Sequence, residues 1–94
     1  MATLNQALGT AIRQVRENAT LTQQEFALRA GISVRALSNL ECGRVLLPRF
    51  GTLYNIAKGL GLQGDDARSL VVQLRSIATQ GGVGKSGTPQ VIET

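Results

Sequence analysis

The chain has 94 residues, 43% of them hydrophobic and only 3% aromatic, so it has room for one domain with a core of aliphatic side chains. It contains one cysteine and no histidine, which excludes an internal disulfide and any Ser-His or Cys-His catalytic pair, and leaves too few ligands for a zinc site. We therefore expect neither an enzyme nor a bound metal or other cofactor.

The net charge of +4 lies in the first two thirds of the chain. Residues 1–60 contain seven Lys or Arg against three Asp or Glu, whereas residues 61–94 contain three of each. A polyanionic partner for the first part is plausible, although a charge this small does not by itself identify one. No apolar run approaches the roughly 20 residues that cross a bilayer, and residues 1–6 lack a signal-peptide pattern, so we expect a cytoplasmic protein without membrane contact.

The sequence predicts five helices, and the first begins near Thr3. Thr3 and Gln6 have the spacing of a capping box, and the helix is expected to end near Asn18. Its apolar residues recur at helical intervals: Leu4, Leu8, Ile12 and Val15.

The second helix has the clearest start in the chain. Thr22 is the expected N-cap, and Glu25 stands three residues later as its capping-box partner. Leu21 and Phe26 occupy the two positions of a hydrophobic staple. Gly31 is expected to end the helix, because glycine readily adopts the left-handed conformation found there.

The third helix is capped by Ser33 and ends near Gly43, a fourth runs from about Phe50 to Leu60, and a fifth begins near Gly64. From Gln80 the composition changes to Gly, Ser, Thr and Pro. We therefore predict an all-α domain over residues 1–79 and a flexible tail or linker over 80–94. The fifth helix has an apolar stripe that either packs inside the domain or forms a dimer contact: Leu70, Val71, Leu74 and Ile77.

The segment 23–42, QQEFALRAGISVRALSNLEC, has the pattern of a helix-turn-helix. Such a motif needs a small residue midway along its first helix, here Ala27, and a turn residue that tolerates positive φ, here Gly31. Apolar residues hold the two helices together: Phe26, Ala30, Ile32, Leu37 and Leu40. The pattern favours DNA binding, and the alternative is a helical hairpin that uses the same residues only for packing.

Four exposed positions of the third helix are candidates for reading bases, because a recognition helix presents its N-terminal side chains to the major groove. Arg35 suits guanine, and Asn39 suits adenine. Val34 suits a thymine methyl, and Ser38 a base or a phosphate. The alternative for Arg35 and Asn39 is an ordinary solvated surface position.

Phosphate contacts are expected from the backbone amides at the two helix starts, after Thr22 and Ser33. Arg44 and Arg49, in the loop that follows the third helix, are expected to add to them. Residues 45–47 of this loop, Val-Leu-Leu, are apolar, and they either pack on the body of the domain or contact another subunit.

The segments LTQQEFALRAGISVRALSNLECGR and LPRFGTLYNIAKGLGL resemble the XRE family, the Cro-like and phage-repressor-like helix-turn-helix regulators. The resemblance implies a compact five-helix, lambda-repressor-like domain of bacterial or phage origin that acts as a homodimer on a near-palindromic DNA operator. It implies base contacts at the four positions above and at Gln23. It also implies an internal ion pair between Arg16 and Glu41, which makes both residues structural.

Two alternatives to a self-contained regulator remain open. One is a protein-interaction module, such as an antitoxin or adaptor, whose exposed surface binds protein. The other is the N-terminal DNA-reading domain of a larger regulator, with which a Gly-rich tail is compatible.

Overall fold

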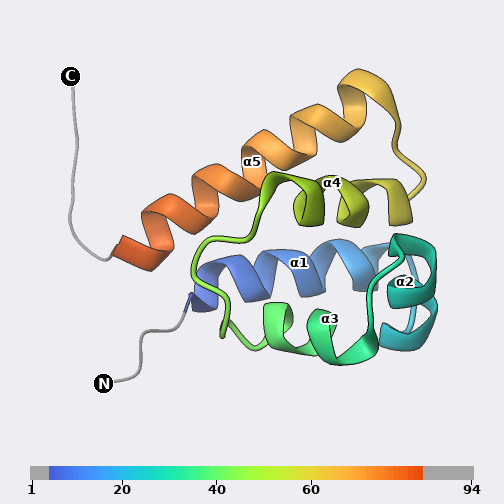
Figure 1. Cartoon of the computed structure of the whole chain (residues 1–94), viewed down its shortest axis with the longest axis horizontal. Helices are drawn as coiled ribbons and strands as arrows, with labels where there is room; N and C mark the ends of the chain where they lie inside the picture. Colours follow the sequence, from blue (N-terminus) through green and yellow to red (C-terminus); the bar gives the residue numbers. More distant parts are fainter. Residues whose placement is uncertain (1–4, 84–94) are drawn as a thin grey trace.

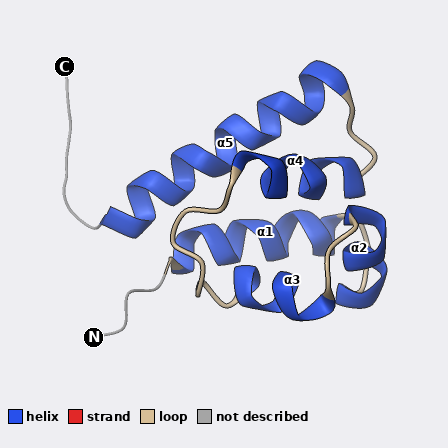
Figure 2. Ribbon diagram, in the orientation of Figure 1, coloured by secondary structure: helices blue, strands red, loops and turns tan. Residues whose placement is uncertain are grey.

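The computed structural model describes residues 5–83, and side chains over 5–80. Five helices follow in chain order: α1 (Gln6–Asn18), α2 (Gln23–Ala30), α3 (Val34–Glu41), α4 (Phe50–Gly59) and α5 (Gly64–Val83). Within the described range every regular element is a helix, so the predicted all-α, five-helix fold is confirmed (Figure 2).

Helix α1 runs through the middle of the domain (Figure 1). It packs against α3 on one side and α5 on the other, while α4 packs against α2 and α5. The core they enclose is aliphatic, with Phe26 as its one fully buried aromatic side chain among the described residues. Its largest members contribute about 1.5–3 kcal/mol each through burial: Phe26, Leu8, Ile12, Leu37, Leu53, Ile56, Leu74 and Val71.

The start of α1 differs from the predicted one. Its N-cap is Asn5, whose Oδ1 accepts a hydrogen bond from the Leu8 amide at 3.2 Å; Thr3 lies outside the described residues. The Asn5 side chain is fully buried, and its Nδ2 donates to the carbonyls of Leu46 at 2.8 Å and Ala78 at 2.9 Å. Asn5 is the better cap because its amide also satisfies two carbonyls from distant parts of the chain, which a threonine cannot do.

Helix α1 ends at Asn18, as predicted, and turns through Thr20, which has a φ of 61°. The amide of Thr20 donates to the Glu17 carbonyl and the amide of Leu21 to the Arg16 carbonyl. This is the Schellman arrangement, with a threonine where glycine is usual. The turn brings Leu21 back toward α1, directly before the helix-turn-helix begins.

The predicted starts of α2 and α3 are confirmed. The Thr22 hydroxyl accepts from the Glu25 amide, and the Glu25 carboxylate accepts from the Thr22 amide, which together form the capping box. The Ser33 hydroxyl accepts from the Ala36 amide at 3.0 Å. Between the two helices Gly31 adopts a φ of 71°, the left-handed conformation expected of it.

Helix α5 continues to Val83, beyond the boundary expected at 79. Glycines weaken a helix by only about 1 kcal/mol each, so the pair at 81–82 does not end it; the rest of the predicted tail, residues 84–94, lies outside the described range. Val71 and Leu74 are buried against the core, and Leu70 and Ile77 pack beside them half-buried. The apolar stripe of α5 therefore packs mainly inside the domain, while Leu70 and Ile77 keep part of their surface exposed.

Candidate nucleic-acid interface

Helices α2 and α3 form a helix-turn-helix held by buried apolar side chains. The amide of Ile32 donates to the carbonyl of Ala27 at 3.0 Å, which closes the turn around Gly31. Ile32 itself is half-buried against the core. The predicted packing positions are otherwise all buried: Phe26, Ala27, Ala30, Leu37 and Leu40.

The outer face of α3 is uncovered. This helix packs against α1 and α2, whereas α4 and α5 lie on the far side of α1 (Figure 1). At its start Val34 and Arg35 are exposed, and Ser38 and Asn39 are half-buried one turn later. The four predicted base-reading side chains of α3 are therefore all at least partly accessible to a ligand.

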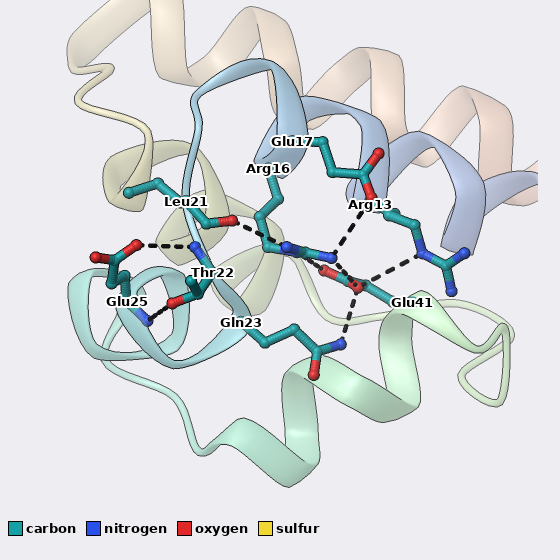
Figure 3. Close-up of polar contacts among 8 residues, drawn as sticks. All are labelled: Arg13, Arg16, Glu17, Leu21, Thr22, Gln23, Glu25 and Glu41. Atoms are coloured by element: carbon teal, nitrogen blue, oxygen red, sulfur yellow. Dashed lines mark hydrogen bonds and ion pairs between the residues drawn. The ribbon is translucent and has the colours of Figure 1, made fainter.

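A buried carboxylate anchors the end of α3 to α1. The Glu41 side chain is only 1% exposed and receives two hydrogen bonds from Arg16, from Nε to Oε2 at 2.6 Å and from Nη2 to Oε1 at 3.1 Å (Figure 3). The third Arg16 nitrogen, Nη1, donates to the Leu21 carbonyl at 2.9 Å, so the α1–α2 turn helps to orient the guanidinium. The ion pair implied by the family resemblance is present, and it fixes α3 relative to α1.

The same carboxylate also holds Gln23, the first residue of α2. Gln23 Nε2 donates to Glu41 Oε1 at 2.9 Å, and Arg13 Nε lies 3.8 Å from that oxygen (Figure 3). Gln23 is half-buried and belongs to a junction of α1, α2 and α3. The structure thus ties this predicted base-reading residue to the interior through its amide nitrogen.

The sequence pattern of the helix-turn-helix domain family matches residues 7–70. The chain belongs to this family. The match covers α1 to α4 and the first part of α5, and it agrees with the XRE-like resemblance of the sequence. Helix-turn-helix domains bind DNA through the second helix of the motif, which here is α3. No curated protein and no solved structure matches the chain.

The side-chain amide of Asn39 is hydrogen-bonded through its oxygen, whereas that of Gln23 is hydrogen-bonded through its nitrogen. Asn39 Oδ1 accepts a hydrogen bond from Arg44 Nη1 at 3.2 Å, on the exposed surface. A two-point contact with adenine uses both the oxygen and the nitrogen of an asparagine amide. The Asn39 oxygen has a second lone pair, so it can accept from adenine beside the Arg44 contact or in place of it.

The loop from α3 to α4 carries both positive charge and exposed apolar side chains. Arg44 and Arg49 are exposed at its two ends. Val45 packs against the core, whereas Leu47 is 54% exposed and Phe50, at the start of α4, 48%. Each of the two alternatives for residues 45–47 therefore applies to part of the segment. Val45 packs on the body of the domain, whereas Leu46 and Leu47 remain available for an intermolecular contact.

Two hydrogen-bonded groups at the motif have shifted pKa values. The hydrogen bonds with Glu41 raise the pKa of Arg16, although burial acts in the opposite direction. Hydrogen bonds from Thr22, first its backbone amide and then its side chain, lower the pKa of Glu25. Both shifts favour the charged form, so the Arg16 guanidinium and the Glu25 carboxylate are charged at neutral pH.

The described part of the chain holds no cluster of metal-ligating side chains and no membrane-spanning helix. No group of three or more Cys, Asp or Glu side chains gathers there as metal ligands would. No helix over residues 5–83 is long and apolar enough to cross a bilayer.

Sequence reasoning missed Gly9, which lets α1 approach α3. A Cβ at this position would overlap the Glu41 carbonyl oxygen and lie 2.9 Å from its carbonyl carbon. The only signal in the sequence is a glycine inside a strong helical pattern, which often marks a close packing contact. The Gln23–Glu41 hydrogen bond was also missed, because a contact between residues 18 positions apart leaves no periodic pattern.

Proposed function

We propose that the protein is a sequence-specific regulator of transcription that binds double-stranded DNA as a homodimer and inserts α3 into the major groove. By occupying a near-palindromic operator it acts as a repressor in the cytoplasm. One observation carries the proposal: α3 is capped at Ser33, held by buried leucines and anchored through Glu41, yet its outer face is uncovered. A helix in this situation can enter a major groove with its N-terminal side chains leading.

The exposed start of α3 supplies the side chains for base recognition. Arg35 can donate two hydrogen bonds to the O6 and N7 atoms of a guanine, and Val34 can contact a thymine methyl. Ser38 and Asn39 follow on the same face, where the Asn39 oxygen already accepts from Arg44 and its second lone pair can accept from a base. Gln23 contributes from the start of α2.

Phosphate binding aligns the domain on the duplex. The free backbone amides that follow Thr22 and Ser33 point out of two helix N-termini, which favour anions. Arg44 and Arg49 add two exposed positive charges from the loop. These contacts carry no sequence information and give an affinity that falls steeply with salt.

Selection of bound sequences from a random duplex pool tests the proposal directly. We expect one enriched near-palindromic motif and a steep loss of affinity as salt rises. Arg35→Ala is expected to weaken binding to that motif by about 1–3 kcal/mol and to relax one base preference. Arg68→Ala, which removes an exposed arginine from α5, is the matched control and is expected to leave the preference unchanged. A selected pool without any enriched motif would contradict sequence-specific binding.

A protein-interaction module, such as an antitoxin or adaptor, is the second candidate. The exposed side chains of Leu47 and Phe50 favour it, since neighbouring apolar groups on a surface often mark a protein contact. Binding to protein but to no duplex DNA at low salt would support this candidate. An N-terminal reading domain of a larger regulator would bind DNA through the same residues.

A further inference from the structure

We propose that Gln23 reads a base as a hydrogen-bond acceptor, through its carbonyl oxygen, and so selects a base with an exocyclic amine in the major groove: adenine or cytosine. The inference rests on the proposed DNA binding and adds that Gln23 accepts, and does not donate, the hydrogen bond to the base. Glu41 acts in it as a positioning residue, because it holds the amide nitrogen of Gln23 inward.

The orientation of the Gln23 amide follows from the chemistry of its partner. Glu41 is ion-paired with Arg16, and a carboxylate offers only acceptors. The atom of Gln23 that lies 2.9 Å from Glu41 Oε1 must therefore be the nitrogen, since the carbonyl oxygen would face another oxygen there. The reverse orientation would set two acceptors together beside a nearly fully buried charge.

The environment of Glu41 keeps the amide in place. Arg16 occupies both carboxylate oxygens, and the Gln23 nitrogen supplies a further donor to Oε1. A buried carboxylate that loses a donor gains no water in exchange, so the Gln23 contact is retained more strongly than a contact at the surface.

The opposite end of the amide is the part that Gln23 offers to a ligand. Its Oε1 points away from Glu41, on the side of α3 (Figure 3), and it accepts no hydrogen bond from any residue over 5–80. Phosphate oxygens are acceptors and cannot bond to it. In the major groove the donors are the N6 amine of adenine and the N4 amine of cytosine.

The first test compares Gln23→Ala with Gln24→Ala on the selected operator and on variants of each base pair. Gln24 is the same residue type at the next, exposed position of α2, and it lacks the Glu41 contact. We expect Gln23→Ala to bind the operator about 10-fold more weakly and to lose its preference at one base pair. A uniform loss on all sequences would overturn the proposal and assign Gln23 to a phosphate through its second amide hydrogen.

The second test uses the unaltered protein, so it does not depend on how well a variant folds. At the base pair identified above, adenine is replaced by purine, or cytosine by 2-pyrimidinone, each of which lacks only the exocyclic amine. We expect about 10-fold weaker binding by the wild type and no further loss in Gln23→Ala, as a double-mutant cycle requires. Undiminished binding to the amine-free base would overturn the acceptor role. Failure to bind any duplex would instead refute the proposed function.

Discussion

The two amide side chains of the helix-turn-helix are held in opposite ways. Gln23 is bonded through its nitrogen to a buried carboxylate, whereas Asn39 is bonded through its oxygen to an exposed arginine. Water competes more strongly with the second contact, which is exposed, than with the first, which is partly buried, so burial favours persistence of the Gln23 orientation. In the proposed complex with DNA, Gln23 therefore carries a preset amide and Asn39 an adaptable one.

Removing Arg16, whose charge supports the preset amide through Glu41, is expected to have the largest effect on the free energy of unfolding. In Arg16→Met the Glu41 carboxylate stays buried without its main donor, and we expect a loss of about 3–5 kcal/mol in the free energy of unfolding, measured by urea denaturation. Arg13→Met is the control, because Arg13 is 51% exposed and lies 3.8 Å from Glu41; there we expect less than about 1 kcal/mol. Equal losses in the two variants would contradict an anchor centred on Arg16.

The close approach of α1 to α3 is the next most sensitive feature. Gly9→Ala forces a methyl group into the backbone of Glu41, and we expect about 1–3 kcal/mol of destabilisation together with a displaced α3. Gly51→Ala, in the first turn of α4, meets open space, and we expect it to be neutral or stabilising by up to about 1 kcal/mol. Thermal melts of the two variants check the contrast, and similar melting temperatures would refute it.

The adaptable amide is tested by removing its partner. Arg44→Ala is expected to change the free energy of unfolding by less than about 0.5 kcal/mol, because the Asn39 contact is exposed. It is also expected to weaken binding to all duplex sequences alike and to reduce the salt dependence by about one phosphate contact. Titrations at several salt concentrations measure both effects. A changed base preference would show instead that Arg44 orients Asn39 for readout.

The smallest expected effect is the pH dependence of the capping box. The pKa of Glu25 is lowered by folding, so its contribution is complete above the unfolded pKa and is lost as the pH falls through the folded value. We expect wild type to be more stable than Glu25→Gln at neutral pH, with the difference shrinking below the ordinary pKa of a glutamate. Urea midpoints measured across the acid range test this, and a constant difference would contradict it.

Local patterns in the sequence predicted the motif well. Thr22, Ser33 and Gly31 act within a few residues of their partners, so their roles follow from short-range capping and turn rules. The start of α1 was placed wrongly because the role of Asn5 depends on carbonyls 41 and 73 positions away. The side-chain orientations of Gln23 and Asn39 could not be predicted from the sequence either, since both depend on which side chains the fold brings together.

The buried Asn5 amide joins the loop after α3 to the last turns of α5, through the carbonyls of Leu46 and Ala78. A force applied at the C-terminal end of α5 would therefore be transmitted through the Asn5 side chain to the loop that carries Arg44 and Arg49. A module attached after α5 would therefore have a mechanical route to the loop that is proposed to contact phosphates.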